Sequence, residues 1–297
     1  MVMDVSISSR KVFAMRCGSM RHTTRLAVLV VAIVASGVGA TSAQATEGHA
    51  RAHGYIALGD SVTFGFSPLL TDPWIPEQFV GYPELIGDRT GRPVTNLGCP
   101  GQTAQALVSL TAVDNGCFDA RAQASQAGFS LLHADYPGTQ LAAALTAVRS
   151  ATQPSLISVQ GGGNEVVICE LSGVPDPQQC MNDYMPRVAA SLRRVVTQLR
   201  GSGYRGRIVL VSYYLVPGLE APLRRLNETI ARTARAEDVA FADASAQFDA
   251  YARDHGGDLC AAGLLIALPD GSCDLHPTRT GQELLADSVL AAARRSS

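Results

Sequence analysis

Arg207-Ile208-Val209-Leu210-Val211-Ser212-Tyr213 is the clearest strand signal in the chain, because β-branched and other apolar side chains follow one another almost without interruption. A strand with one face in water alternates apolar and polar residues, whereas a strand of a parallel sheet covered on both faces is apolar throughout. The stretch therefore predicts a buried, central, parallel strand. Four shorter runs of similar character predict further strands: Tyr55–Leu58, Pro93–Asn96, Leu156–Gln160 and Val239–Asp243.

Amphipathic stretches lie between these runs. From Tyr184 to Leu199 the apolar residues recur every three or four positions, which places them on one helix face, and Gly201 then favours a helix end. Three more stretches predict helices: Thr139–Arg149, Ala221–Ala236 and Thr280–Ala293. Strands that alternate with helices predict a doubly wound α/β domain. In such a domain the ligand site lies beyond the carboxyl ends of the strands.

Composition narrows the class of protein. The chain has 297 residues, of which 46% are hydrophobic and 17% charged, as is usual for a globular protein of one or two domains. The formal net charge is -2, from 24 basic and 26 acidic residues. Because there is no basic surplus to neutralise phosphates, we expect no nucleic-acid partner.

The N-terminus resembles a secretory signal peptide. Arg21 and Arg25 precede an apolar run over residues 26–38, and Ala43-Gln44-Ala45 supplies the small residues of a cleavage site. The alternative is a membrane anchor, but this run is shorter than the roughly 20 residues that span a bilayer. We expect cleavage after Ala45, secretion, and no stable membrane insertion afterwards. Since Met20 directly precedes Arg21, residues 1–19 are explained as an upstream extension.

Cysteine usage agrees with export. Six of the seven cysteines lie after residue 45, and an even number in an exported chain indicates disulfides. Six cysteines allow 15 pairings. Pairing each cysteine with its sequence neighbour predicts Cys99–Cys117, Cys169–Cys180 and Cys260–Cys273. The alternative, a zinc site, lacks any C-x-x-C or H-x-x-x-H spacing.

Two candidate functional residues follow the first two predicted strands. Ser61, in the stretch from Gly59 to Gly65, sits where a tight strand-to-helix turn can expose a nucleophile, although serine at this place is also a common helix N-cap. Gly101 lies in the stretch from Asn96 to Thr103. A glycine there leaves its N–H open as a donor, or forms a plain Pro-Gly turn.

Two more candidates follow later. Asn164 comes after three glycines at the end of the third strand and can donate its amide to an oxyanion. The glycines also suggest a phosphate loop, but no G-K-[ST] or G-x-G-x-x-G pattern follows. His276 has an acid, Asp274, two residues before it and Pro277 after it, which favours a functional histidine over an ordinary surface or core one.

Taken together, these stretches resemble the four signature blocks of the SGNH/GDSL hydrolase family, in the family's order and across nearly the whole mature chain. The blocks are Gly59-Asp60-Ser61 with Gly65, Asn96–Gly101, Gly162-Gly163-Asn164 and His276-Pro277. The six cysteines resemble those of secreted actinobacterial members with three local disulfides. The resemblance implies one SGNH hydrolase domain over residues 46–297. Its expected fold is a flavodoxin-like three-layer α/β/α sandwich with a central five-stranded parallel sheet.

The resemblance also implies the chemistry. Ser61 would be the nucleophile and His276 the base of a carboxylic ester hydrolase of the esterase or lipase type. The N–H groups of Ser61 and Gly101 and the side chain of Asn164 would hold the oxyanion. No metal or organic cofactor is needed, and we expect a monomer acting on a small-molecule, lipid or carbohydrate ester.

Two departures from the family pattern stand out. Glu165 follows Asn164 where the family usually has Asp. The family's acid lies three residues before the histidine, where this chain has Cys273. Asp274 is one residue nearer, which shifts an extended chain by about 3.3 Å and turns the side chain to the opposite side. Three partners for His276 therefore stay open: Asp274, Asp270 or a main-chain carbonyl.

Two other functions stay open. The displaced acid is compatible with a non-catalytic module that binds a polysaccharide or lipid on the same fold. An acyltransferase would use the same acyl-serine with a sugar or lipid acceptor in place of water. The substrate's acyl and alcohol parts are not determined. Five apolar side chains after Ser61 either line an acyl groove or only fill a surface loop: Leu69, Leu70, Trp74, Ile75 and Phe79. Residues at the end of the fourth strand could also reach the site: Tyr213, Tyr214, Leu215 and Val216.

Overall fold

A five-stranded parallel sheet forms the centre of the structure. The computed structural model describes residues 53–70, 75–150 and 153–295, so the leader predicted over residues 1–45 and the side chain of Trp74 lie outside the described residues. The strands are β1 (Tyr55–Leu58), β2 (Val94–Asn96), β3 (Leu156–Gln160), β4 (Arg207–Val211) and β5 (Ala240–Ala242). All five predicted strands are confirmed, three of them shorter by one or two residues at an end.

The strand order, β2-β1-β3-β4-β5, determines where the site forms. From β1 the chain first adds β2 on one side and then β3, β4 and β5 on the other, so the order reverses between β1 and β3. Ile56 of β1 pairs with Ile157 of β3, which pairs in turn with Ile208 of β4. All three are buried. A reversal of strand order opens a crevice at the carboxyl ends of the strands, the usual ligand site of such sheets.

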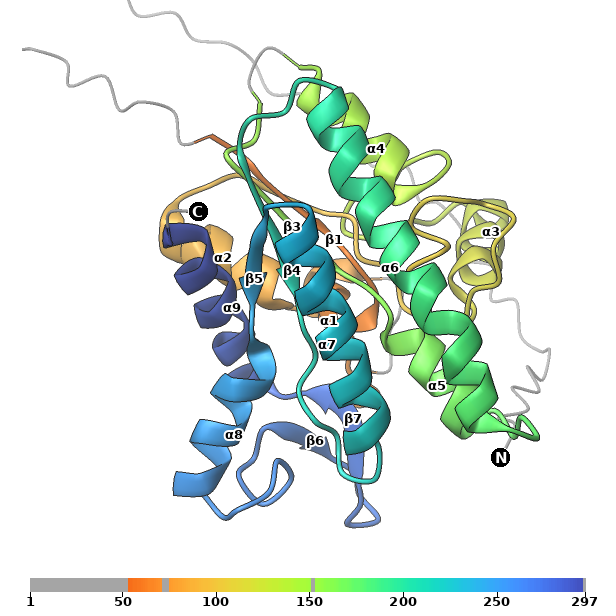
Figure 1. The fold of residues 1–297 in the computed structure, drawn as a ribbon, viewed down its shortest axis with the longest axis vertical. Coiled ribbons are helices and arrows are strands. Elements are labelled where there is room, and N and C mark those ends of the chain that lie inside the picture. The colour runs from red at the N-terminus through yellow and green to blue at the C-terminus, as the bar shows by residue number, and fades with distance from the viewer. Residues whose placement is uncertain (1–52, 71–74, 151–152, 296–297) are drawn as a thin grey trace, which may run out of the picture. The chain divides into compact units, whose positions relative to one another are not determined.

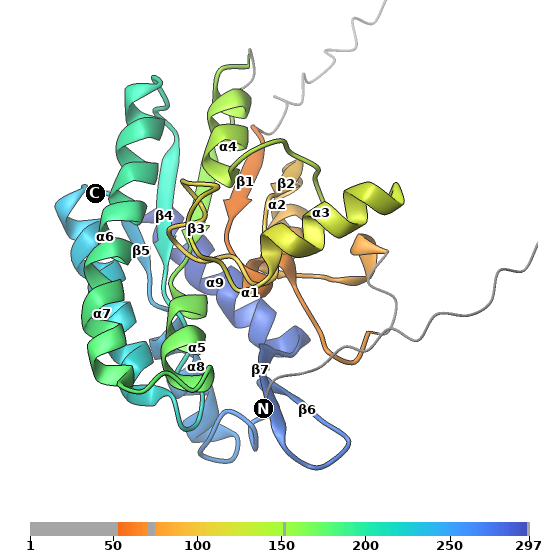
Figure 2. The same ribbon diagram turned by 90° about the vertical axis from the view of Figure 1, so that its right-hand side faces the viewer.

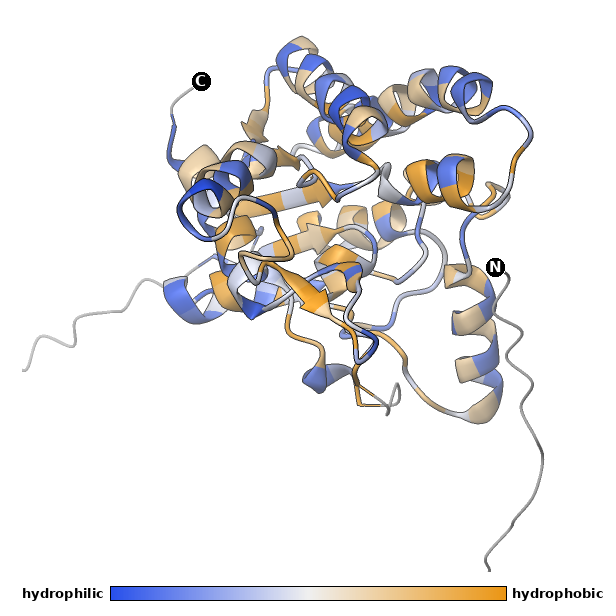
Figure 3. Ribbon diagram, turned by 90° about the horizontal axis from the view of Figure 1, so that it is seen from below, coloured by the Kyte–Doolittle hydropathy of each residue, from blue (hydrophilic) through white to orange (hydrophobic). Residues whose placement is uncertain are grey.

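Helices cover both faces of the sheet (Figures 1 and 2). On one face lie α4 (Gln140–Val148), α6 (Pro177–Gly201) and α7 (Glu220–Ala236), with α5 (Gly163–Leu171) packed against α6 and α7. On the other face lie α2 (Tyr82–Thr90) and α9 (Arg279–Arg294), with α8 (Ala244–Asp254) against α9. The predicted three-layer α/β/α sandwich is confirmed. Figure 3 shows apolar strands between helices that carry both polar and apolar residues.

The four predicted helices are α4, α6, α7 and α9. α6 begins earlier than predicted because the Asp176 side chain caps it by accepting from the Gln179 N–H. The sequence analysis did not predict α2, α3 (Cys117–Ala127), α5 or α8. In α3 the reason is visible, since only Cys117 and Ala124 are buried and no apolar stripe forms.

A small hairpin completes the carboxyl edge of the sheet. β6 (Leu265–Ala267) pairs in antiparallel fashion with β7 (Cys273–Pro277), and Figure 2 shows the hairpin below the sheet, beyond α1 (Ser61–Phe64). Neither strand was predicted. β7 matters because it carries both Asp274 and His276 to the edge where β1 ends.

The three predicted disulfides are confirmed. Cys99–Cys117 joins the segment after β2 to α3, Cys169–Cys180 joins α5 to α6, and Cys260–Cys273 joins the segment after α8 to β7. Their Cα–Cα distances are 5.8, 5.6 and 6.1 Å. All six cysteines after residue 45 are paired in this way, so the zinc interpretation is wrong. Among the described residues, none of the helices has the length and apolar character needed to cross a membrane.

Candidate active site

Ser61 is the first residue of the one-turn helix α1, directly after β1. Its neighbour Asp60 caps this helix, because the Asp60 side chain accepts from the Val62 N–H at 3.0 Å. Gly65 ends the helix in the left-handed region, with φ of 83°. The interpretation of Ser61 as a helix cap is therefore wrong, and the Ser61 hydroxyl is free for another partner.

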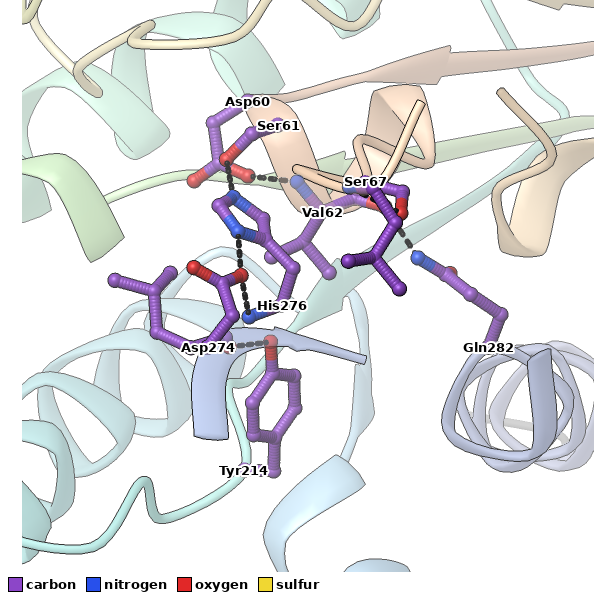
Figure 4. Close-up of polar contacts among 10 residues, drawn as sticks. Asp60, Ser61, Val62, Ser67, Tyr214, Asp274, His276 and Gln282 are labelled. Atoms are coloured by element: carbon purple, nitrogen blue, oxygen red, sulfur yellow. Dashed lines mark hydrogen bonds and ion pairs between the residues drawn. The ribbon is translucent and has the colours of Figure 1, made fainter. Parts of the chain in front are cut away.

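That partner is His276 (Figure 4). The Ser61 Oγ lies 2.8 Å from His276 Nε2, and His276 Nδ1 lies 2.5 Å from Asp274 Oδ1. The same Asp274 oxygen accepts the backbone N–H of His276 at 2.9 Å. With the ring proton on Nδ1, the imidazole donates to Asp274 and leaves the Nε2 lone pair directed at the serine.

The displaced acid reaches the histidine because β7 is extended. Side chains two residues apart in a strand point to the same face, so Asp274 and His276 lie side by side on β7. The one-residue shift therefore does not turn the Asp274 side chain away from His276. Asp270, the second alternative, is exposed, and its carboxylate accepts from the N–H and hydroxyl of Ser272.

Several contacts hold β7 in place. The buried Tyr214 hydroxyl donates to the carbonyl of Leu275, between the acid and the histidine, at 2.7 Å. Phe66 packs against the His276 ring with 4.8 Å between ring centroids. The Cys260–Cys273 disulfide fixes the residue before Asp274. The sequence did not predict that Tyr214 and Phe66 contact β7. It indicated only that Tyr214 lies near the end of a strand and that Phe66 lies near Ser61.

The charge on Asp274 is favoured in this setting. Burial alone would raise the pKa of its carboxyl, but the hydrogen bond from His276 and the charge of that ring together outweigh burial and hold the pKa below its usual value. Asp274 therefore stays ionised at neutral pH and can accept the hydrogen bond from His276.

A second buried carboxylate lies behind the serine. Asp60 Oδ2 accepts from the Tyr213 hydroxyl at 2.5 Å. Burial raises the pKa of Asp60, against the opposing effects of Tyr213, the Val62 N–H and the charge of His276. Tyr213 is in turn held by Asn227, which exchanges two hydrogen bonds with the Tyr213 backbone at 2.8 and 2.6 Å. The sequence analysis did not find Asn227.

This tyrosine joins two parts of the site. A side chain at Gly163 would come within 2.7 Å of the Tyr213 ring and 3.2 Å of Asp60 Oδ2. Gly163 precedes Asn164, and Asp60 precedes Ser61. Tyr213 therefore lies between the turn that carries the serine and the helix start that carries the asparagine.

The predicted oxyanion donors lie at this edge too. Gly101 has φ of 84°, and a Cβ there would collide with the backbone of Asn115, so only glycine fits. Asn164 lies in the first turn of α5 and donates one amide N–H to the Gln102 carbonyl at 3.0 Å, while its oxygen accepts from Asn115. The other amide N–H has no acceptor among the described residues, and Asn164 lines one pocket with Ser61.

Glu165, the other departure from the family pattern, ties α5 to the segment after β2. It is fully buried, and its Oε1 accepts from the Ala104 N–H at 2.8 Å. Its Oε2 has no hydrogen-bond partner among the described residues. Burial raises the pKa of Glu165 to about 7.

Two apolar recesses adjoin these residues. A pocket of about 40 Å³ is lined by Ser61 and Asn164 together with Tyr213, Tyr214 and Val216, so the end of the fourth strand reaches the site as expected. A groove of about 280 Å³ is lined by Phe64, Phe66 and Phe79 with residues of the α3 region. Of the residues considered for an acyl groove, Phe79 lines this groove, whereas Leu69 and Ile75 are exposed.

The five-stranded α/β/α sandwich, with these residues at the carboxyl edge of the sheet, defines an SGNH-type hydrolase. Residues 57–284 match the GDSL-like lipase/acylhydrolase family. The chain belongs to this family and is a carboxylic ester hydrolase.

Comparison with solved structures agrees with the fold. An acetylxylan esterase from Geobacillus stearothermophilus is 18% identical, with a TM-score of 0.51 over 82% of this chain and 95% of that chain. A catalytic mutant of an acetylxylan esterase from the same organism is 17% identical, with a TM-score of 0.52 over 82% of this chain and 97% of that chain. A comparison with curated proteins found no match. At these identities the likeness concerns the fold alone.

Proposed function

We propose that the protein is a secreted hydrolase that cleaves carboxylic esters through an acyl-serine intermediate on Ser61. The Ser61 Oγ attacks the ester carbonyl carbon while His276 Nε2 takes the hydroxyl proton. The tetrahedral intermediate collapses as the bond to the alcohol oxygen breaks, and His276 returns the proton to that oxygen. Water then attacks the acyl carbon while His276 takes its proton. The bond to the Ser61 Oγ breaks, His276 returns the proton to that oxygen, and the acid is released. The hydrogen-bonded chain from Ser61 through His276 to Asp274 is the observation that carries this proposal.

Asp274 and the oxyanion donors complete the mechanism. Asp274 holds the histidine proton on Nδ1 and stabilises the imidazolium that forms during each proton transfer. The N–H groups of Ser61 and Gly101 and the free amide N–H of Asn164 bind the negative oxygen of the tetrahedral intermediate. Loss of one such donor usually costs about 100- to 1000-fold in rate. This chemistry needs no metal or organic cofactor.

Secretion is supported by the sequence of residues 1–45 and by the three disulfides, which form and persist in oxidising compartments. The alternative of a non-catalytic binding module loses its main argument, because it depended on an acid too far from His276. The acyltransferase alternative differs only in the acceptor, and no contact among the described residues favours an acceptor other than water.

The test is active-site labelling with a fluorophosphonate, followed by peptide mapping, beside turnover of p-nitrophenyl esters. We expect the adduct on Ser61 and loss of both labelling and turnover in Ser61→Ala. Ser67→Ala is the matched control, because among the described residues the Ser67 hydroxyl accepts a local N–H, from Leu69. Turnover that survives Ser61→Ala, or an adduct on another residue, would contradict the mechanism.

A further inference from the structure

The two apolar recesses differ in size and in which reacting groups they adjoin. The smaller pocket contains Ser61 and Asn164 in its wall, and the larger groove contains neither. The groove instead contains Phe66, whose ring packs against His276. If the mechanism above holds, these contacts distinguish the two halves of an ester.

The acyl half must lie in the smaller pocket. In the tetrahedral intermediate the carbonyl carbon is bonded to the Ser61 Oγ and its oxygen points to the amide of Asn164. The acyl chain and the alcohol oxygen both leave this carbon. Because the alcohol oxygen must face His276 Nε2 to be protonated, the acyl chain takes the remaining side, where Ser61 and Asn164 line the pocket. Val166, Leu223 and Leu275 close that space with apolar side chains. A volume of about 40 Å³ holds a few water-sized groups, which fits an acetyl or propionyl chain.

The alcohol half must lie on the side of His276. The departing alkoxide takes its proton from His276 Nε2, so its oxygen lies within hydrogen-bond distance of that atom. Phe66, whose ring packs against the His276 ring, forms part of the wall of the groove of about 280 Å³, together with Phe64, Phe79, Leu131 and Leu132. An apolar alcohol gains free energy by leaving water for such a surface.

The polar residues of the groove do not change this conclusion. The Arg121 guanidinium donates to the carbonyls of Tyr136 and Gly138 and lies over the Tyr136 ring, 4.3 Å from its centroid. These contacts direct Arg121 N–H groups to backbone carbonyls and not into the groove. Gln123 is exposed on α3. The groove is therefore suited to a hydrocarbon chain or ring and offers no carboxylate for a polyhydroxylated or cationic alcohol.

We propose that the small pocket beside Ser61 binds a short acyl group and that the groove beside His276 binds an apolar alcohol. The protein is then an esterase for acetyl and propionyl esters of hydrophobic alcohols, and not a lipase that selects long fatty acyl chains. This inference rests on the proposed acyl-serine mechanism.

Two isomeric esters test the assignment directly. Octyl acetate and ethyl octanoate have the same atoms and nearly the same hydrophobicity but carry the long chain on opposite sides of the carbonyl. We expect kcat/KM for octyl acetate to exceed that for ethyl octanoate by at least tenfold, since about one methylene too many in a fitted pocket already costs this much. Equal values, or a preference for ethyl octanoate, would overturn the proposal.

One substitution in each recess tests which half of the ester it binds. Leu131→Trp fills the groove and should lower the ratio of kcat/KM for octyl acetate to that for ethyl acetate by about tenfold. Val216→Ala enlarges the pocket and should raise the ratio for ethyl butanoate to ethyl acetate. Leu145→Trp, at a half-buried leucine on α4, is the control and should change neither ratio. The opposite pattern, with Leu131→Trp affecting acyl length, would also refute the assignment.

Failure of the inference and failure of the mechanism give different results. Without Ser61 labelling and without cleavage of any ester, the proposed mechanism fails. With Ser61 labelled and short and long esters both cleaved, a preference for ethyl octanoate refutes the subsite assignment alone.

Discussion

At the scale of single residues, the spacing between Asp274 and His276 decides whether this chain has a complete hydrogen-bonded site. Counting along the sequence, the acid is one position too near the histidine. In space the two side chains lie on one face of β7, with Oδ1 and Nδ1 2.5 Å apart. An acid two residues before the histidine on an extended strand thus makes the carboxylate–imidazole contact that the family usually makes with an acid three residues before it.

Asp274→Asn should lower kcat by about 10⁴-fold, because the amide favours the wrong histidine tautomer and cannot stabilise the imidazolium. Steady-state kinetics with p-nitrophenyl acetate measures this. Asp270→Asn is the control and should leave kcat unchanged, since Asp270 is exposed and bonds to Ser272. A small effect of Asp274→Asn would mean that a main-chain carbonyl supports His276 instead.

Tyr213→Phe should reduce kcat by about tenfold with little change in KM. The variant removes one hydrogen bond to the buried Asp60 carboxylate, and bonds to charged groups are worth roughly 1.5–3 kcal/mol. Tyr204→Phe is the matched control, because Tyr204 is equally buried and its hydroxyl donates to the Arg207 carbonyl at the start of β4. A boronic acid that forms a tetrahedral adduct with serine should bind more weakly to Tyr213→Phe only. Equal effects of both variants on kcat would indicate a general loss of stability.

At the scale of elements, the β6–β7 hairpin and the first turn of α5 carry the site, and each has its own tie to the rest of the molecule. Cys260–Cys273 anchors β7, and Glu165 anchors α5 to the segment that contains Gly101. The sheet brings these elements to one edge, and the disulfide and the Glu165 hydrogen bond hold them in place there.

Replacing Cys260 and Cys273 by serine should lower both stability and kcat. Each disulfide closes a loop of similar length and contributes about 3 kcal/mol in the chain-entropy description. Replacing Cys169 and Cys180 should therefore lower the melting temperature by a similar amount, but with a smaller loss of kcat, because that bond joins α5 to α6 away from His276. Calorimetry and kinetics on both double variants test this. Equal losses of kcat would contradict a positioning role for the hairpin disulfide.

Glu165→Gln should change how stability depends on pH. The folded-state pKa of Glu165 is about 7, above its ordinary value of 4.5, so between these pH values the folded chain binds more protons than the unfolded chain. The contribution of Glu165 to the free energy of unfolding therefore falls by roughly 3 kcal/mol as the pH rises from about 4.5 to about 7.

The glutamine variant lacks this titration. Its melting temperature relative to the parent should increase as the pH is raised from 5 to 8. Other carboxyls, including Asp274, titrate in both proteins and cancel in the difference. A difference in melting temperature that does not vary with pH would show that Glu165 is already ionised in the folded protein at low pH.

At the scale of the whole molecule, the three disulfides connect folding to export, because disulfides form in the oxidising compartments that an exported protein enters. Expressed in a secreting host, the protein should begin at Thr46 and contain no free thiol. Intact mass and N-terminal peptide mapping measure both properties. A secreted product that retains residues 26–38 would contradict the signal-peptide prediction and favour an anchor.

Much of this molecule could be predicted from the sequence alone. Short, mostly apolar runs predicted all five strands of the sheet, since a strand covered on both faces buries most of its side chains. Glycines and polar residues after those strands made Ser61, Gly101 and Asn164 the candidate site residues, because parallel strands end at one edge. Local pairing of cysteines was correct because each pair closes a short loop. These properties depend on residue type and on neighbours in the chain.

Other properties depend on contacts between distant residues, and only the tertiary structure decided them. The sequence could not place Asp274 against His276, because whether residues 273–277 are extended depends on pairing with β6 and on the hydroxyl of Tyr214, about 60 residues away. It could not reveal Asn227 behind Tyr213 or the burial of Glu165. Nor could it separate a small pocket at Ser61 from a groove at His276, since each wall combines side chains from several elements. Local physics determined the strands and their ends, and packing determined the geometry of the site.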